Sequence, residues 1–243
     1  MLQTQDGVRS MTAGVVILAA VAGQMSLTGR AHGDVIWGNA ADRTILDLST
    51  DLLIDNGSAE VGNNGGIMRT YVVPFQLPAR PAGTVVTAAD VRFDVLRNMQ
   101  SSVMNVDLYA LTPRASSAVL ATDLYAGPLD AAAGATLIQD NFVTVAGTDI
   151  NSYVELHTNA GGDAALAAYL NSAYTTHGAG AWVFLRLSCD NAAAPNINFY
   201  FVHSANTSWQ APRIELTFGV VPTPATAALA GAGALVMARR RRR

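Results

Sequence analysis

Lysine is absent from this 243-residue chain, and charged residues of all kinds make up only 14% of it. Half of the residues are hydrophobic, which is enough to build an apolar core. This composition excludes a disordered chain and a highly charged coiled coil. The length allows one large domain or two small ones.

Cysteine occurs once, at Cys189, which excludes an intramolecular disulfide and zinc sites of the CxxC type. Side chains in residues 182–189 alternate, so Val183, Leu185, Leu187 and Cys189 share one face of a predicted strand. We therefore expect Cys189 to be a small core residue. A reactive thiol is the alternative, but no basic residue adjoins it in the sequence.

Basic residues are concentrated at the two ends. Residues 34–218 hold 8 arginines against 17 acidic residues, a net charge of −9, whereas the whole chain carries −3. A body this acidic repels phosphate backbones, so we expect no binding to nucleic acid.

Catalytic and metal-binding motifs are also missing. The chain has no GxSxG, P-loop, HExxH, EF-hand loop or Rossmann fingerprint. His157, His177 and His203 are isolated in the sequence, and a surface or turn position is the expectation for each. We expect no enzyme activity and no cofactor.

Three aspartates, Asp47, Asp51 and Asp55, recur at intervals of four residues. Carboxylate oxygens suit Ca²⁺, so a calcium site is one hypothesis for this segment. The spacing matches no known calcium loop, and a solvated edge or loop is the other interpretation.

The N-terminal segment has the three parts of a secretory signal peptide: Arg9, the apolar run of residues 13–23, and small residues before Asp34. The apolar run is shorter than the roughly 20 residues that cross a bilayer. Cleavage is expected after Gly33, with Ala31 at the −3 position, and residues 20–22 offer a competing site. An ordinary buried helix is the alternative interpretation.

The C-terminal segment contains a candidate membrane span. Residues 225–238 are apolar and rich in Ala and Gly, and five arginines follow them: Arg239, Arg240, Arg241, Arg242 and Arg243. Moving these charges across a membrane is costly, so they are expected to stay in the cytoplasm while residues 34–218 lie outside. Pro222 and Pro224 keep the preceding segment extended.

A proline pair, a short apolar helix and a terminal arginine cluster together resemble the PEP-CTERM sorting signal of exported bacterial proteins. The resemblance covers residues 221–243, with Pro222 and Pro224 as the two prolines and Thr223 where glutamate is usual. It implies recognition, and cleavage near the prolines, by an exosortase, a membrane enzyme. A plain tail anchor with a positive stop is the alternative.

The central region is predicted to be rich in β-strands. Several runs alternate or are rich in β-branched and aromatic residues: 70–77, 91–97, 104–111, 141–145, 152–156, 182–189, 196–202 and 213–218. Turn clusters separate them, at residues 56–57, 63–66, 81–83 and 190–191. One helix is expected over residues 163–173, with Asp163 as its N-cap. Many short strands favour a sandwich or jelly roll over βαβ units.

The order of these elements resembles the DNRLRE-type β-sandwich domains of secreted bacterial proteins, which are relatives of carbohydrate-binding modules. The matching pieces are residues 69–77, 81–89, 103–111, 154–157, the helix with 180–187, and 211–218. The resemblance implies a jelly-roll-like sandwich. The Asn/Arg motif that names the family is not visible in its usual form near residues 203–208.

Exposed aromatic rings would suit the apolar faces of sugars. The candidates are Trp37, Trp182, Trp209, Tyr109 and Tyr125, and the polar surroundings of Trp209 make it the best exposed ligand-binding candidate. Core or interface packing is the competing interpretation.

These observations predict an all-β, jelly-roll-like β-sandwich with one short helix over residues 34–218. A signal helix (1–33) precedes it, and a sorting segment with a transmembrane helix (219–243) follows. We expect an exported, non-enzymatic protein of the cell surface or extracellular matrix, anchored in the inner membrane at least transiently. Its expected partners are the secretion machinery and an exosortase-type enzyme. A carbohydrate-binding module for extracellular polysaccharide is the alternative, followed by a glycan lyase or hydrolase.

Overall fold

The computed structural model describes residues 32–48, 51–99, 104–124, 135–189, 197–206 and 210–220. Within these residues the chain forms twelve strands and one α-helix, which confirms the expected all-β class. The strands are β1 (His32–Trp37), β2 (Arg43–Asp47), β3 (Leu52–Asp55), β4 (Glu60–Asn64), β5 (Ile67–Gln76), β6 (Thr84–Met99), β7 (Val106–Arg114), β8 (Thr136–Val143), β9 (Val154–His157), β10 (Trp182–Cys189), β11 (Ile197–Val202) and β12 (Arg213–Val220). The helix is α1 (Ala160–Thr176).

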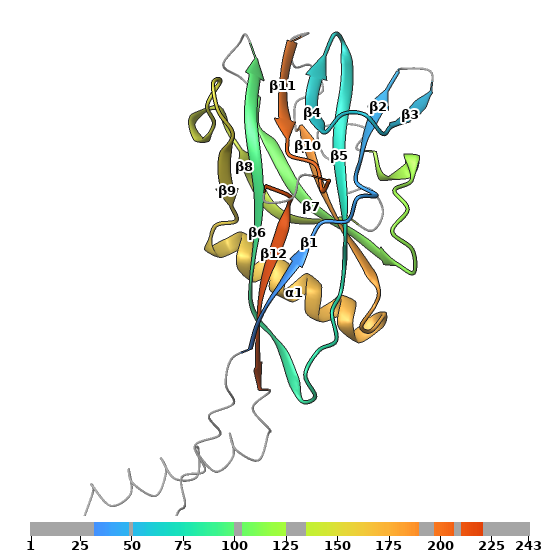
Figure 1. Ribbon diagram of the computed structural model, residues 1–243, viewed down its shortest axis with the longest axis vertical. Coiled ribbons are helices and arrows are strands. Elements are labelled where there is room, and N and C mark those ends of the chain that lie inside the picture. The colour runs from blue at the N-terminus through green and yellow to red at the C-terminus, as the bar shows by residue number, and fades with distance from the viewer. Residues whose placement is uncertain are drawn as a thin grey trace, which may run out of the picture.

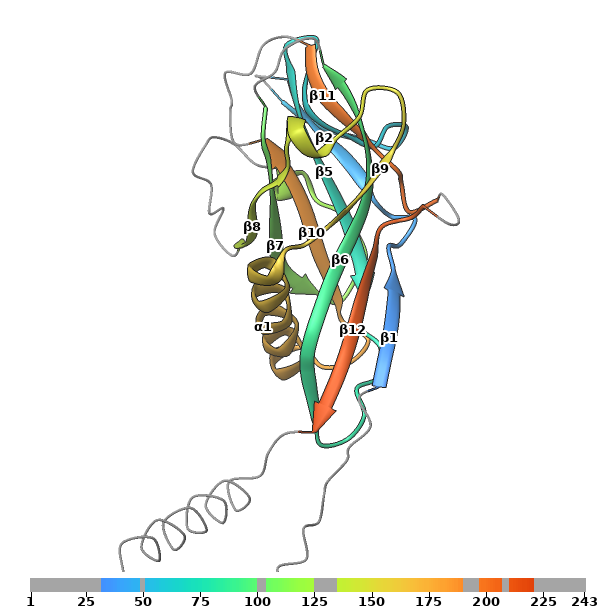
Figure 2. The same ribbon diagram turned by 90° about the vertical axis from the view of Figure 1, so that its left-hand side faces the viewer.

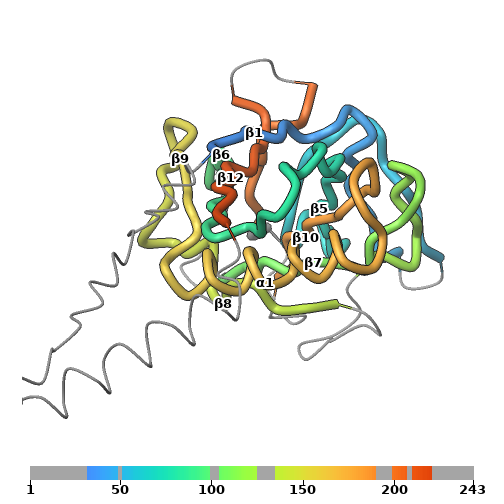
Figure 3. The backbone as a smooth tube through the Cα atoms, turned by 90° about the horizontal axis from the view of Figure 1, so that it is seen from below, coloured from blue at the N-terminus to red at the C-terminus, as the bar shows by residue number. Residues whose placement is uncertain are grey.

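All of these strands belong to one curled antiparallel sheet (Figure 1). Its order is β1-β12-β6-β11-β4-β5-β10-β7-β8, with β2 between β3 and β5, and with β9 beside β6. Viewed from below, β1, β12 and β6 lie on one side of the molecule, and β5, β10 and β7 lie on the other (Figure 3). The hydrophobic core fills the space that these two walls enclose.

The strand β6 shapes this curvature because it is long enough to pair with three others. Its first part pairs with β12 and its last part with β11, while β9 pairs with its middle. Val91, Phe93 and Val95 point inward and are fully buried, as the alternation of residues 91–97 predicts. A register shift in the β12 pairing, between Thr217 and Phe218, adds a local irregularity to this wall.

The predicted core position of Cys189 is confirmed, since it is 1% exposed on the inward face of β10. The opposite face of β10 is buried too, beneath the segment that leads into the 3₁₀ turn η1 (Ala121–Asp123). A second, smaller core cluster forms there from Ile45, Val72, Leu111, Val119, Leu124 and Phe184. Burial on both faces explains why β10 is nearly continuous in hydrophobic residues.

The helix α1 lies against β6 and β8 and covers the side of the core between them (Figure 2). Leu166, Leu170, Ala173 and Tyr174 form its buried stripe, at the spacing of one helical face. The amide of Asn171 joins the helix to β6, because it accepts a hydrogen bond from the Val86 nitrogen (2.9 Å) and donates one to the Val86 oxygen (2.8 Å).

The helix begins earlier than the sequence predicts. Asn159, and not Asp163, is the N-cap, and its side chain accepts hydrogen bonds from the backbone nitrogens of Gly161 and Gly162. The two glycines suggest a break, yet they lie in the first turn, where backbone N–H groups need a capping acceptor. A Cβ at Gly162 would lie 2.6 Å from Oε1 of Gln139, the end of a flexible side chain, and 3.1 Å from Cβ and Cγ2 of Thr158, so a larger residue there would have to displace both neighbours.

Four strands, β1 to β4, are absent from the sequence prediction. They are short and contain Asp, Asn and Gly, which have low strand propensity. Residues 63–66 were expected to form a turn, but Asn63 and Asn64 end β4. Only Gly65 and Gly66 turn, with φ of +66° and +84°. Two consecutive positive φ values are typical of the tight type I′ hairpin.

The ends of the sheet meet at one place. β1 and β12 pair antiparallel, from His32 opposite Phe218 to Trp37 opposite Arg213. The start of β1 and the end of β12 therefore lie side by side at the lower end of the molecule (Figures 1 and 2). These strands extend beyond the expected limits of residues 34 and 218, to His32 and Val220.

No helix among the residues that the structure describes is long and apolar enough to cross a membrane. The apolar run of the predicted signal peptide (13–23) and that of the predicted transmembrane helix (225–238) both lie outside these residues, whereas residues 32 and 33 of the predicted signal segment belong to β1.

Candidate functional site

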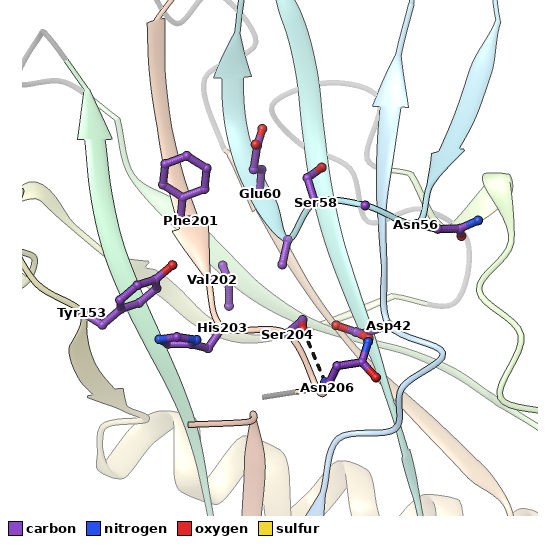
Figure 4. A pocket seen from close by; sticks show the side chains of 12 residues that line it. Asp42, Asn56, Ser58, Glu60, Tyr153, Phe201, Val202, His203, Ser204 and Asn206 are labelled. Carbon is purple, nitrogen blue, oxygen red and sulfur yellow. Dashed lines mark hydrogen bonds between the residues drawn. The ribbon is translucent and has the colours of Figure 1, made fainter. Parts of the chain in front are cut away.

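A cleft of about 430 Å³ opens on the outer face of the sheet, where β11 pairs with β4 (Figure 4). Four segments line it: residues 56–60, residues 201–206, Tyr153 before β9, and Asp42 before β2. Figure 4 shows Tyr153 and His203 on one side, Asn56 on the opposite side, and Asp42 and Ser204 between them.

Tyr153 and His203 are brought together by β6. Val95 pairs with Val154 of β9 on one edge and with Val202 of β11 on the other. Because side chains alternate along a strand, the residues next to these valines face outward on the two sides of β6. The rings of Tyr153 and His203 stack there, with centroids 3.7 Å apart and planes inclined by 35°.

The environment of this ring pair keeps both rings uncharged at neutral pH. Partial burial lowers the pKa of His203, and the charge of Asp94 only partly opposes this. Burial also raises the pKa of Tyr153, so its hydroxyl keeps its proton. The pair therefore presents a neutral aromatic surface with one hydroxyl that can donate a hydrogen bond.

Asp42 is 6% exposed and supports the cleft from below. Its Oδ2 accepts hydrogen bonds from the Tyr71 hydroxyl (2.5 Å) and from the Ala205 backbone nitrogen (3.0 Å). Burial, followed by the charge of Asp42, raises the pKa of Tyr71 well above its usual value. The carboxylate thus fixes the loop of residues 203–206 against β5.

The opposite wall is a turn held by Asp55, the last residue of β3. Its carboxylate accepts hydrogen bonds from the Ser58 hydroxyl (2.5 Å) and the Gly57 nitrogen (2.8 Å), and both bonds lower the pKa of Asp55, that from Ser58 more strongly. The backbone carbonyl oxygen of Ser58 in turn accepts a hydrogen bond from the Thr44 hydroxyl at 2.8 Å. These bonds hold the turn of residues 56–58 at the rim of the cleft.

Glu60 supplies the second carboxylate of the cleft. Its Oε2 is 2.6 Å from Nη1 of Arg69 and accepts a hydrogen bond from the Asn64 amide at 3.2 Å. Among the described residues, neither Oε1 of Glu60 nor Oδ1 of Asp42 accepts a hydrogen bond. Each carboxylate is therefore held by one oxygen and has its second oxygen available as an acceptor.

A second polar cluster lies on the outer face of β6 and β9. His157 is held between two carboxylates, with Nδ1 2.6 Å from Oδ2 of Asp90 and Nε2 2.7 Å from Oε1 of Glu155. Burial alone would lower the pKa of His157, but the hydrogen bonds and charges of Asp90 and Glu155 outweigh it and raise the pKa. Arg92 joins the cluster through Glu155 and Asp94.

The three aspartates of the calcium hypothesis do not converge. Asp51 directly precedes β3 and Asp55 ends it, which places them roughly 13 Å apart along an extended strand. Asp51 binds the nitrogen of Leu52, and both oxygens of Asp55 are engaged in its turn. Within the described ranges, no group of three or more His, Cys, Asp or Glu residues is arranged to hold a metal ion.

The predicted aromatic candidates are dispersed. Tyr109 is 9% exposed, and Trp182 packs against the smaller core cluster. Trp37 is 46% exposed on β1, with the Arg213 guanidinium 5.6 Å from its ring centroid, and it does not line the cleft. Trp209 and Tyr125 lie outside the described residues.

Of the residues predicted for signal cleavage and sorting, only Gly33 lies within the described residues. Gly33 lies in β1, opposite Thr217, whereas Ala31 lies outside the described residues. So do the predicted sorting residues, which are Pro222, Thr223, Pro224, Arg239, Arg240, Arg241, Arg242 and Arg243.

Sequence reasoning missed the cleft. Tyr153 and His203 are 50 positions apart in the chain, and neither belongs to a motif. The one available signal was that Tyr153 lies within the predicted strand 152–156 and that His203 directly follows the predicted strand 196–202. That signal does not reveal that both strands flank β6.

Comparison with known proteins gives no further guide, since no family model matches the chain and no curated protein is similar to it.

Proposed function

We propose that this protein is exported and is displayed, without catalysis, at the cell surface or in the extracellular matrix. The observation that carries the proposal is the pairing of β1 with β12, which brings both ends of the domain to one place. A signal segment before β1 and a membrane segment after β12 would then lie at the same side of the domain. The cleft lies where β11 pairs with β4, and none of its described lining residues belongs to β1 or β12.

The C-terminal segment gives the proposed route. Pro222 and Pro224, with Thr223 between them, form the extended cleavage region of a PEP-CTERM-like signal, and residues 225–238 form the membrane helix. The five arginines hold the end of the chain in the cytoplasm. An exosortase-type enzyme would then release or transfer the domain.

The structure of β1 bears on where the signal peptide is cut. Cleavage after Gly33 would remove His32 and Gly33, which pair with Phe218 and Thr217. Cleavage after Ala22 would leave β1 complete. We therefore favour the site at residues 20–22 over the site at Ala31 and Gly33.

Fractionation of bacteria that express the full chain tests export, together with the intact mass of the recovered protein. We expect the domain to be accessible to external protease and to have lost its N-terminal segment. Replacing Arg239 to Arg243 with glutamine should abolish this topology, whereas replacement with lysine, which keeps the charge, should preserve it. Recovery from the cytosol with an intact N-terminus would overturn the proposal.

A second candidate function, binding of carbohydrate, is favoured by the cleft itself. Flat aromatic faces next to fixed polar acceptors suit the alternating C–H and O–H surfaces of sugars. The two walls of the sheet also support a relationship to jelly-roll-like sandwiches of the carbohydrate-binding type, although a fold likeness alone does not specify a ligand.

A glycan array with the exported protein tests this second function. We expect binding to at least one class of saccharide, with the saccharide recovered uncut. Release of shorter products would instead support the lyase or hydrolase alternative. Binding that Trp209→Ala abolishes would place the site at the aromatic residue that the sequence singles out.

A further inference from the structure

The size and position of the cleft suit a small part of a larger ligand. Its volume of about 430 Å³ falls in the range of small-molecule sites, and it opens outward from the sheet. Because it is formed above a paired sheet, its floor and walls are supported by β4, β6 and β11. Because paired strands are already ordered, binding a ligand there costs little conformational entropy.

One wall of the cleft is aromatic. The Tyr153 and His203 rings stack on one another, and Phe201, two positions before His203, lies on the same outward face. Phe201 packs edge-to-face against Phe199, with centroids 5.0 Å apart. These rings present apolar surface without charge to the ligand.

The remaining groups are mostly hydrogen-bond acceptors or amides. Asp42 and Glu60 each keep one carboxylate oxygen available, and both side chains are buried and fixed by their other oxygen. Asn56 and Asn206 are exposed at the rim and contribute amides. Carboxylates accept strong, charge-assisted hydrogen bonds from hydroxyl groups.

The charges of the cleft select among saccharides. Among the described residues that line it, the carboxylates of Asp42 and Glu60 are present and no lysine or arginine is. Arg69 is already paired with Glu60, and the guanidinium of Arg43 donates to the backbone oxygens of Ala40 and Asp42. A uronate or sulfate would meet like charge without a compensating partner, and this is unfavourable in a partly desolvated site.

We propose that this cleft binds a neutral saccharide, with Tyr153 and His203 against the sugar ring and with Asp42 and Glu60 as acceptors of its hydroxyl groups. This inference rests on the second candidate function and adds the site and the class of sugar. Acidic polysaccharides are excluded as ligands of the cleft.

Titration calorimetry on the exported protein tests this with six-sugar probes: cellohexaose, xylohexaose, mannohexaose and maltohexaose as neutral chains, hexagalacturonate as an acidic chain, and hexaglucosamine as a cationic one. We expect binding to at least one neutral chain. Tyr153→Ala should weaken that binding about ten-fold or more, as removal of a central aromatic contact does. Asp42→Asn keeps an acceptor for Tyr71 and should weaken it several-fold.

Trp37→Ala is the matched control, because it removes an exposed aromatic ring that does not line the cleft. Its affinity should stay within about two-fold of the wild type. Thermal unfolding of each variant establishes that it is folded before binding is compared.

The possible failures are distinguishable. Equal or tighter binding of hexagalacturonate or hexaglucosamine overturns the preference for neutral sugars but keeps the carbohydrate-binding function. Neutral binding that Tyr153→Ala does not alter moves the site away from the cleft. Absence of binding to every saccharide overturns both the inference and the function on which it rests.

Discussion

Gly38 lies where the chain leaves β1 and passes close to the core. A Cβ there would lie 2.8 Å from Cγ2 of the buried Val73 and 3.2 Å from the Pro212 oxygen. Val73 is β-branched and enclosed, so it has little freedom to move aside. Gly38→Ala should therefore lower the free energy of unfolding by about 1–3 kcal/mol, as overpacking does.

The matched control for this change is Gly33→Ala, within β1. A Cβ at Gly33 meets only the Leu216 oxygen, at the ordinary distance of 3.8 Å. Its effect should remain within about 0.5 kcal/mol. Chemical denaturation of both variants measures the difference, and equal costs would contradict the close packing at Gly38.

His157 should make stability depend on pH. Its folded pKa is raised above the unfolded value of 6.5, so the folded state binds the proton more tightly. The stabilisation is complete below pH 6.5 and is lost as the pH rises through the folded pKa. His157→Gln should thus destabilise the protein more at pH 5.5 than at pH 8.5. The side chain is 43% exposed, so solvent screening keeps the effect below about 1 kcal/mol.

His203 gives the opposite sign and serves as the comparison. Burial lowers its folded pKa, so its contribution is present above the unfolded value and is lost as the pH falls. The loss of unfolding free energy relative to the wild type should be larger at low pH for His157→Gln. For His203→Asn it should be larger at high pH. Parallel behaviour of the two variants would contradict the assigned environments.

The start of α1 is set by the side-chain hydrogen bonds of a single residue, Asn159. Asn159 Oδ1 accepts from the nitrogens of Gly161 (3.0 Å) and Gly162 (2.9 Å). Asn159→Ala should lower the free energy of unfolding by about 1 kcal/mol, the usual cost of removing a cap. Ser172→Ala, at an exposed position of the same helix, is the control and should cost nothing measurable. A loss no larger than that of the control would contradict the assigned cap.

Strands that bury a regular face are predictable from the sequence, and short edge strands are not. The bounds of β10 match the predicted residues 182–189, because every residue on its inward face, from Val183 to Cys189, is apolar. β6 extends beyond residues 91–97 in both directions, since pairing with β12 and β11 stabilises segments with a weak pattern of their own. β4 depends on distant partners in the same way.

The candidate site depends on the arrangement of the whole sheet, because its residues come from distant parts of the chain. Its lining residues come from positions 42 to 206, and Asp42 joins two of these segments through Tyr71 and Ala205. Each contact follows from the strand order, which local patterns do not determine. The sequence therefore predicted the all-β class of the fold, whereas the cleft required the assembled sheet.

The arrangement of the two end strands makes a final prediction that joins fold and export. Gly33 and Thr217 are register partners on β1 and β12. Opposite residues of an antiparallel pair have Cα atoms about 4.5–5.5 Å apart, which is within the range of a disulfide. In the double variant Gly33→Cys with Thr217→Cys, a disulfide should form in the oxidising compartment outside the cytoplasm. The native Cys189 is 1% exposed and should not compete.

The bridge would close most of the domain into one loop, with a stabilisation of up to about 5 kcal/mol against thermal unfolding. Intact mass before and after reduction detects it. Val35→Cys with Thr217→Cys is the control, because these positions are diagonal and about 7–8 Å apart, too far for a bridge.

A mature chain that has lost residue 33 would instead assign signal cleavage after Gly33. A chain that retains residue 33 with both introduced thiols free would contradict the pairing of the ends or the export of the domain, and the cellular fraction from which it was recovered separates these two failures.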